Sequence, residues 1–389
     1  RGSAATRINK DGLIETVAVG KSRLNYPLID GVVNGCPSHL LEPTRSNLIP
    51  YSEDFSNAYW IKNGSSVTSG FTSPKGDLSA FKLVEDLSNG AHFTSSTLVS
   101  FTVGSAYTIS FFAKVGEVNY VKIQGDIGFG CIFNLSNGTK VQSADSRVIS
   151  SEMIELTNGW YKCSITLQEA SRSTDKGYAV LIKDGTNPSY IGNGTSGVYI
   201  FGAQVEQGSY PTSYIPTTNS AVTRVAETAT GAGDASTFND SEGVLMAEIS
   251  ALADDGTERI IGLSDGTNNN RILIYYSTIS NRIEYFIQSG GVLQVFFSIS
   301  PNDVENFNKI AFKYKQNDFS LFVNGIKVAT DLVGNTPIGL SNLSFSDVNG
   351  GSPFYGNTKQ IQYFDSALND SDLEKITSWT SFTDLANGQ

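Results

Sequence analysis

The sequence predicts an all-β protein with two antiparallel β-sandwich or jelly-roll domains and one short C-terminal helix. Asn-Gly occurs nine times and Asp-Gly five times among the 389 residues, and these dipeptides supply the positive φ angles that tight hairpin turns require. Short runs rich in Val, Ile, Phe, Tyr and Thr lie between them, and these residues favour strands. Many short strands with regular turn signals are typical of sandwiches and jelly rolls. The clearest predicted strands are residues 107–113, 120–124, 161–167, 271–276 and 309–314.

Only the segment 366–379 carries a convincing helical pattern. Either Asn369 or Ser371 can serve as its N-cap. Acidic residues near its start complement the positive end of the helix dipole. Its apolar residues recur at roughly helical spacing, at Leu368, Leu373, Ile376 and Trp379.

Composition divides the chain into segments with different roles. The first segment is rich in turns, and a small, polar stretch near the middle indicates a linker. The chain starts at Arg1 without a methionine, so we expect further residues upstream. The predicted segments are an extended arm (1–47), a first jelly roll (48–224), a linker (225–240), a second sandwich (241–380) and a tail (381–389).

Residues 197–224 predict the last strand of the first domain and an extended strap that follows it. The strand alternates Val198 and Ile200 with aromatic residues. Gly208, Pro211 and Pro216 then end any regular element, because proline cannot donate to a central ladder.

Three blocks of sequence carry a resemblance to known proteins. They are residues 5–26 with 36–60, residues 104–115 with 158–167 and 197–224, and residues 309–331 with 355–377. Together they resemble tailed-bacteriophage virion proteins. The first block resembles the segment that precedes jelly-roll modules in fibre and minor structural proteins. The second is similar to the carbohydrate-binding-module-like jelly roll of those proteins, and the third resembles a laminin-G or concanavalin-like sandwich.

The resemblance implies a virion location and a fibre or decoration role, with other virion proteins contacted through upstream residues. It also implies a homo-oligomer, with a trimer favoured. Isolated extended segments cannot bury their own large side chains. We therefore expect the arm and the strap to supply intersubunit contacts through Leu40, Leu41, Tyr210 and Tyr214.

Charge excludes some classes of partner. Asp plus Glu exceed Lys plus Arg by 38 to 27, which gives a net charge of −11. An acidic chain without a basic cluster repels phosphate backbones, so we expect no nucleic-acid binding. No apolar run approaches the roughly 20 residues of a membrane span, so we expect no membrane insertion.

Catalytic motifs are missing, and we expect no enzyme activity. The two histidines, His39 and His92, lack triad partners. Packing is the favoured role for His39, and His92 is expected to be a loop or strand-edge residue. Cys36 and His39 have zinc-like spacing, but no second ligand pair exists. Acidic residues such as Asp254-Asp255 are adjacent in turns, so their side chains diverge rather than face each other across a cleft.

Cysteines and loop oxygens leave two structural alternatives open. Cys131 and Cys163 lie in strand-like runs and could pair across a sheet, although buried free thiols are the favoured interpretation. We expect no cofactor. A structural calcium ion at residues 264–270 is the alternative to a plain type I′ hairpin at Asp265-Gly266.

Exposed tyrosines of the second domain are the candidate ligand-binding residues. Sugars stack on aromatic rings beside amide and carboxylate groups. One of Tyr275 and Tyr276 must face outward from a regular strand, whereas Trp160 is expected to pack inward. The predicted glycan site is Tyr275 or Tyr276 as the stacking residue, with Asp265, Asn268 and Asn270 giving hydrogen bonds.

Two main functions follow from these observations. The favoured one is a phage virion structural protein whose sandwiches bind host surface glycans or serve only as spacers. The alternative is the non-catalytic carbohydrate-binding part of a secreted bacterial polysaccharide-degrading enzyme or adhesin.

Overall fold

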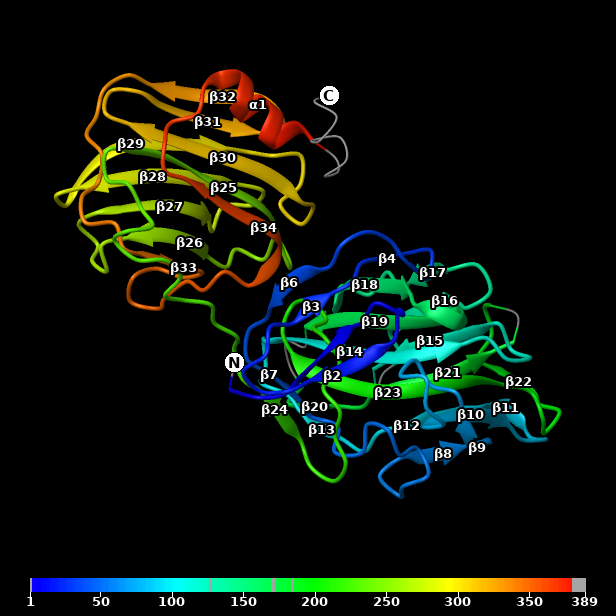
Figure 1. Ribbon diagram of the computed structural model, residues 1–389. Helices are drawn as coiled ribbons and strands as arrows, with labels where there is room; N and C mark the ends of the chain where they lie inside the picture. Colours follow the sequence, from blue (N-terminus) through cyan, green and yellow to red (C-terminus); the bar gives the residue numbers. More distant parts are fainter. Residues whose placement is uncertain (1, 126–127, 169–171, 184, 380–389) are drawn as a thin grey trace. The chain divides into compact units, whose positions relative to one another are not determined.

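The computed structural model describes residues 2–125, 128–168, 172–183 and 185–379. The chain forms two compact units, shown in Figure 1. Unit 1 comprises Arg1–Pro37 and Thr44–Ala226, and unit 2 comprises Ser38–Pro43 and Glu227–Gln389. Antiparallel strands dominate both units, and one α-helix is present among the described residues. The predicted all-β class with a single C-terminal helix is therefore confirmed.

Unit 1 is a sandwich of two six-stranded antiparallel sheets, as expected for the first domain. Their facing sides enclose one core that includes Trp60, Phe111 and Leu181. In spatial order, the first sheet is β18 (Val148–Glu155), β19 (Trp160–Gln168), β14 (Ala106–Lys114), β23 (Gly197–Gln207), β10 (Ala80–Glu85) and β9 (Ser65–Phe71). The second is β17 (Thr139–Gln142), β16 (Gly130–Asn134), β15 (Tyr120–Gln124), β21 (Tyr178–Ile182), β12 (Phe93–Ser95) and β8 (Ile61–Asn63).

Unit 1 also contains short strands outside its two main sheets. They form two-stranded pairs near the termini of the unit and in its loops, with a 3-10 turn at Thr157–Gly159. The pairs are β1 (Ala5–Ile8) with β2 (Ile14–Val17), β4 (Leu28–Ile29) with β5 (Val32–Val33), β7 (Arg45–Asn47) with β24 (Val222–Arg224), β11 (Asn89–Ala91) with β22 (Ser189–Ile191), and β13 (Val99–Ser100) with β20 (Thr174–Asp175). Strand β3 (Leu24–Asn25) lies between β2 and β4 in the chain.

A second apolar cluster lies on the outer side of the first sheet. Trp160, Phe112 and Phe201 are buried there together with Ile14 from β2 and Tyr214 from the strap. Trp160 is thus buried, as predicted, but in this outer cluster rather than in the core between the sheets. The arm and the strap cover an apolar sheet face of their own unit. Burial of Tyr214 within the chain removes the reason for expecting it at a subunit interface.

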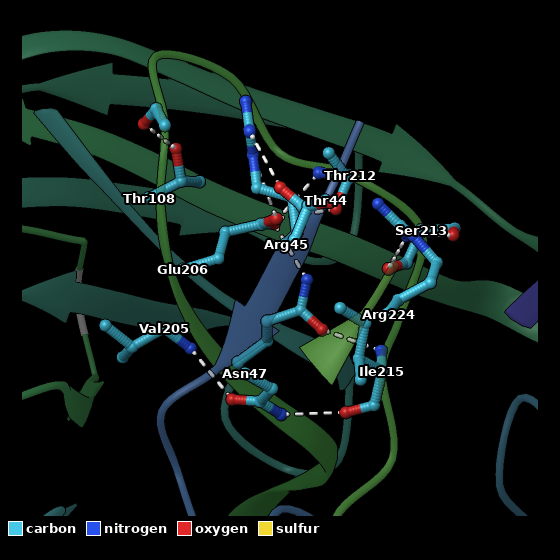
Figure 2. A network of polar contacts seen from close by, with 12 residues as sticks. Thr44, Arg45, Asn47, Thr108, Val205, Glu206, Thr212, Ser213, Ile215 and Arg224 are labelled. Atoms are coloured by element: carbon cyan, nitrogen blue, oxygen red, sulfur yellow. Dashed lines mark hydrogen bonds and ion pairs between the residues drawn. The ribbon is translucent and has the colours of Figure 1, made fainter. Parts of the chain in front are cut away.

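Asn47 ties the strap to the last strand. Its Nδ2 donates to the carbonyl oxygens of Ala203 at 3.0 Å and Ile215 at 2.9 Å. Its Oδ1 accepts from the backbone N–H of Val205 at 3.2 Å. Figure 2 shows that one side chain from β7 satisfies backbone groups of both β23 and the strap. Such groups must be paired where water is excluded.

Glu206 anchors the start of the strap. Its fully buried carboxylate accepts from the backbone N–H of Thr212 at 2.9 Å, from the Thr212 hydroxyl at 2.5 Å and from Gln204 Nε2 at 2.7 Å. Arg45 Nε lies 3.8 Å from the same carboxylate (Figure 2). A buried charge is tolerated only when donors and a counter-charge surround it, and the strap supplies most of these donors.

Unit 2 is a second antiparallel sandwich around its own core, which includes Tyr276, Tyr285 and Phe312. One sheet contains β6 (Ser38–Leu41), β34 (Gly356–Phe364), β25 (Glu242–Ala251), β30 (Asn308–Lys315), β31 (Phe319–Val323) and β32 (Ile326–Asp331). The other contains β29 (Val292–Ile299), β28 (Ile283–Ser289), β27 (Arg271–Tyr276), β26 (Arg259–Ser264) and β33 (Asn342–Ser344).

Helix α1 (Asp370–Ser378) closes unit 2. Asn369 is its N-cap, and its side chain accepts from the backbone N–H of Asp372 at 3.0 Å, which confirms one of the two predicted caps. Leu373 is fully buried against Met246 and Phe322 on the outer side of the larger sheet. The apolar stripe of the helix therefore packs on the strands that precede it in sequence.

The expected arm is divided between the units. Residues 38–41 form β6, which pairs antiparallel with β34, so that Leu40 lies opposite Asn357. Leu40 and Leu41 are buried. Ser38–Pro43 belong to unit 2, and the other residues of the expected arm belong to unit 1. The interpretation of residues 1–47 as a separate arm with unburied leucines is therefore wrong, because a strand partner more than 300 residues away covers them.

Two predicted turns have different outcomes. Asn324 and Gly325 have φ values of 48° and 82° between β31 and β32, as a two-residue type I′ turn requires. Asp265-Gly266 does not form such a turn. A six-residue loop connects β26 to β27, and the Asp265 N–H donates to Asn270 O at 3.1 Å.

Candidate functional site

The candidate site is the outer face of the five-stranded sheet in unit 2. Alternate residues of β28 turn to opposite sides, so Ile283, Tyr285 and Ile287 are buried in the core. Glu284, Phe286 and Gln288 occupy the other face and are half-buried. This alternation follows from the two-residue period of a strand. It produces a sheet surface on which aromatic and polar side chains are mixed.

An apolar row crosses this face. Leu273 on β27 pairs with Phe286 on β28, and Phe286 pairs with Phe296 on β29. Phe296 is 51% exposed. Side chains directly opposite each other on neighbouring strands lie close enough to form one continuous surface. The two phenylalanines therefore provide an accessible aromatic surface at the β28–β29 side of the sheet.

Arg271 forms the polar centre of the face. Its Nε donates to Gln288 Oε1 at 2.6 Å, and its Nη1 donates to Asn268 Oδ1 at 2.7 Å. The guanidinium carbon lies 5.1 Å from the centre of the Phe286 ring, within the range of a cation–π contact. Burial lowers the pKa of Arg271, while the nearby charge of Asp347 opposes that shift. The guanidinium is held in place but remains half-exposed.

Tyr275 occupies the next row. It pairs with Glu284 on β28, and its hydroxyl donates to Glu258 Oε1 at 2.5 Å. The other oxygen of Glu258 accepts from the Ser352 hydroxyl at 3.0 Å. Burial, and then the hydrogen bond to Glu258, raises the pKa of Tyr275. The ring is therefore fixed on the outer face with its hydroxyl engaged and its edge half-exposed.

The segment 346–353 covers the β26 end of the face. A side chain added at Gly262 would approach Ser346 O at 3.3 Å and Leu273 Cδ2 at 2.7 Å. Leu273 is consequently buried, although it points away from the core between the sheets. Glycine at 262 allows this close packing. The accessible part of the face is the area over β27, β28 and β29.

The predicted site residues are only partly brought together here. Tyr275 lies on the outer face and Asn268 contacts Arg271. Tyr276 is 2% exposed and belongs to the core, with its ring 5.6 Å from that of Phe354. It cannot stack on a ligand, and its inclusion in the site is wrong. One tyrosine of the pair faces outward, as strand alternation requires.

Asp265 and Asn270 hold the loop together. Asp265 Oδ1 accepts from the Thr267 backbone at 2.7 Å, and its Oδ2 accepts from Asn270 Nδ2 at 2.9 Å. Asn270 is buried, and its Oδ1 accepts from the Gly290 N–H at 3.0 Å. Burial opposes ionisation of Asp265, but the hydrogen bonds from Asn270 and Thr267 outweigh it and lower the pKa.

The same contacts bear on the calcium alternative for residues 264–270. Calcium needs converging oxygen ligands, whereas Asp265 faces N–H and O–H donors. No cluster of three or more His, Cys, Asp or Glu side chains suited to a metal occurs in the described parts of the chain. The loop is therefore held by its own hydrogen bonds, which stabilise the connection between β26 and β27.

None of the histidines and cysteines belongs to the strands of this sheet. His92 lies between β11 and β12, at a strand edge as predicted. It is buried, and its ring nitrogens contact Gly64 O at 2.5 Å and Tyr190 O at 3.1 Å. His39 lies on β6. Cys131 and Cys163 are free, buried thiols in the core of unit 1, as the favoured interpretation held.

Phe286, Phe296 and Arg271 are the residues that the sequence reasoning missed. Phe286 follows Tyr285 within a run of alternating residues, so the pattern shows that one of the two faces outward. Only the partner strands decide which one it is. Arg271 carries no local signal, because its contacts come from Asn268 and from Gln288 on the next strand.

No family model and no curated protein matches this chain. Among solved structures, it is similar to the CBM40 module of the Ruminococcus gnavus IT-sialidase, with 17% identity over 39% of this chain and 95% of that one, at a TM-score of 0.32. The leech intramolecular trans-sialidase has 19% identity over 37% of this chain and 24% of that one, also at 0.32. A heptameric SAP-like pentraxin from Limulus polyphemus has 15% identity over 35% and 70%, at 0.29.

These similarities are partial and weak, and they do not establish a shared function. The structures named above are one sialidase module, one trans-sialidase and one pentraxin rather than phage proteins, so the resemblance to virion proteins receives no support from them. Among the described residues, no helix is long and apolar enough to cross a membrane.

Proposed function

We propose that this chain is a non-catalytic carbohydrate-binding protein whose unit 2 binds glycan on the outer face of the five-stranded sheet. The observation that carries the proposal is the pair of half-buried Phe286 and exposed Phe296 beside Arg271, which Gln288 and Asn268 hold in place. This is the alternative function of the sequence analysis, assigned to a defined surface.

The chemistry of a sugar matches this surface. A pyranose ring presents C–H groups on its faces, which pack on aromatic side chains, and hydroxyl groups at its edge. Planar groups such as a guanidinium and an amide bind neighbouring oxygens in defined directions. Phe286 and Phe296 would supply the stacking surface, and Arg271 and Gln288 the directional hydrogen bonds.

Preorganisation favours binding at this site. The Arg271 side chain is already restrained by two hydrogen bonds and by the Phe286 ring. Less rotamer entropy is then lost when a ligand binds. A glycan bound at this face would be held weakly at each copy. Multivalent display would strengthen such binding.

A glycan array probed with the purified chain tests the proposal. We expect Phe286→Ala and Phe296→Ala each to weaken binding about three- to tenfold, because an aromatic contact contributes about 0.5–1.5 kcal/mol. Ile326→Ala on β32 is the matched control, since it truncates an equally exposed apolar side chain on the other sheet. No binding by the unaltered chain would leave a purely architectural role. Full binding by both phenylalanine variants would place the site elsewhere.

The absence of catalysis is part of the proposal. Incubation with bacterial and algal polysaccharides should release no reducing ends above a heat-treated control. Release of such ends by the fresh protein would contradict the non-catalytic assignment.

The virion location and the trimer remain proposals that rest on sequence resemblance. Electron microscopy of particles from the native source, labelled with an antibody against this chain, tests the location. Light scattering on the intact protein tests the oligomeric state, and a monomer at micromolar concentration would contradict the trimer.

A further inference from the structure

A cavity of about 290 Å³ lies in unit 1, where four segments of that unit meet. The β1–β2 hairpin contributes Thr6 and Ile14, and the strap contributes Tyr214. Glu53 comes from the loop after β7, and Lys75 with Asp77 comes from the turn between β9 and β10. The volume is near the lower end of the range for small-molecule sites, about 300 Å³.

Three charged groups form one side of the cavity. Lys75 Nζ lies 2.9 Å from Glu53 Oε2 and 3.2 Å from Asp77 Oδ2. It also lies 5.4 Å from the centre of the Phe201 ring. Burial opposes the charge of Lys75, but Glu53 and Asp77 outweigh it and raise its pKa. The cluster therefore places one lysine ammonium between two acidic side chains.

One buried carboxylate oxygen in this cavity is incompletely hydrogen-bonded. Glu53 Oε1 has no hydrogen-bond partner of good geometry among the described residues, although the Tyr214 hydroxyl interacts with the Glu53 carboxylate. That hydroxyl also lies 2.7 Å from Ser52 Oγ. A ligand hydroxyl that donates to Oε1 would complete the hydrogen bonding of this buried acceptor.

The cavity is held in shape before any ligand enters. The Thr6 hydroxyl donates to Tyr214 O at 2.6 Å, which fixes the hairpin to the strap. The Ile14 N–H donates to Pro74 O at 3.0 Å, which fixes the hairpin to the lysine-bearing turn. Ser73 Oγ donates to Asp77 Oδ1 at 2.6 Å within that turn. Preformed walls of this kind favour specific binding of a small ligand.

We infer that this cavity is a second ligand site, separate from the sheet face of unit 2, and that it binds a neutral sugar residue. Pro216 is exposed and supplies an apolar wall for the ring, beside the buried Ile14 and Tyr214. Glu53, Asp77 and Lys75 supply acceptors and a donor for hydroxyl groups. Two acidic side chains beside one lysine disfavour phosphates and sugars that carry a carboxylate. The strap is therefore a wall of a binding site as well as a cover for the sheet.

Titration calorimetry with simple methyl pyranosides tests the inference. The neutral probes are the methyl glycosides of glucose, galactose and mannose, and the anionic probes are glucuronate and inorganic phosphate. We expect at least one neutral probe to bind at millimolar concentration, and both anions to bind at least tenfold more weakly.

Three variants localise the binding. Thr16→Trp places a bulky ring at the exposed rim and should abolish binding of the neutral probe. Val19→Trp, at a position that is 57% exposed in the same N-terminal region, is the matched control and should bind normally. Glu53→Gln replaces an acceptor oxygen and should weaken binding at least fivefold. Melting temperatures of all three variants check that they are folded.

The experiment separates this site from the sheet face of unit 2. Every titration is repeated in a Phe286→Ala background, in which binding at unit 2 is weakened. If Phe286→Ala still binds the neutral probe and the double variant with Thr16→Trp does not, the cavity is the binding site. This conclusion holds even if the proposed glycan site of unit 2 is wrong. Failure of all neutral probes, or normal binding by folded Thr16→Trp, overturns the inference.

Discussion

Tyr275 and Tyr276 are adjacent on β27 and lie on opposite sides of the same sheet. The Tyr276 ring is buried against Phe354, and its hydroxyl lies 3.5 Å from Ile249 O. The Tyr275 ring lies on the outer face, and its hydroxyl donates to Glu258 Oε1. One step along the strand therefore separates a core residue from a candidate ligand contact.

Replacing Tyr276 or Tyr275 by alanine should affect different properties of the protein. Tyr276→Ala should lower the free energy of unfolding of unit 2 by about 3–5 kcal/mol, since it leaves a large cavity in the core. Tyr275→Ala should change stability far less and should instead weaken glycan binding. Urea unfolding followed by circular dichroism measures the first effect, and a glycan array measures the second. Equal stability of the two variants would contradict the assignment.

Arg271→Lys keeps the positive charge but loses the planar guanidinium. A lysine cannot donate to Gln288 and Asn268 in the same fixed geometry, so we expect glycan binding to fall several-fold without a change in fold. Arg282→Lys, near the start of β28, is the matched control. If both variants bind like the unaltered chain, the guanidinium has no role in recognition.

Glu206→Ala should loosen the strap. The substitution leaves the Thr212 N–H and Gln204 Nε2 without their acceptor, which should cost about 2–4 kcal/mol of unfolding free energy. Limited proteolysis should then cleave within residues 208–221 earlier than in the unaltered chain. Glu152→Ala, which truncates an exposed glutamate on β18, should have no such effect. An unchanged cleavage rate in Glu206→Ala would mean that the strap is held by other contacts.

The lowered pKa of Asp77 predicts that the free energy of unfolding decreases at acid pH. Burial opposes ionisation, but hydrogen bonds from Ser73 and Ser79 and the charge of Lys75 lower the pKa of Asp77 from 3.8 to about 2. A carboxyl whose pKa is lower in the folded state stabilises the fold above its unfolded pKa. That contribution should be present above about pH 4 and should disappear as the pH falls toward 2.

The comparison of Asp77→Asn with the unaltered chain measures this contribution. The difference in unfolding free energy should be constant near neutral pH and should shrink between about pH 4 and pH 2. A difference that stays the same down to pH 2 would show that the Asp77 charge does not contribute to stability.

The three cysteines should differ in reactivity. Cys36 is exposed, whereas burial raises the pKa of Cys131 and raises that of Cys163 well above its ordinary value. Because the thiolate is the reactive form, a thiol reagent near neutral pH should label one cysteine per folded chain and three after unfolding. Rapid labelling of all three in the folded protein would contradict the burial of Cys131 and Cys163.

Local signals in the sequence determined the Asn324-Gly325 turn, the C-terminal helix and the fold class. Asn324-Gly325 adopts its two-residue turn because asparagine and glycine tolerate positive φ values. Asn369 caps α1 because its side chain reaches a backbone N–H three residues away. The strands at 120–124 and 271–276 follow from β-branched and aromatic runs. Each of these features depends on residues within a few positions of one another.

Contacts between distant residues decided which side chains are buried and where the cavity lies. Leu40 is buried because residues 38–41 pair with β34, and Tyr276 rather than Tyr275 lies in the core because of the register that β27 adopts between β26 and β28. The cavity beside Glu53 and Lys75 requires four segments that are separate in the chain. A sequence pattern shows that a strand has two different faces, but only its packing partners determine which face is covered, since burial depends on long-range contacts.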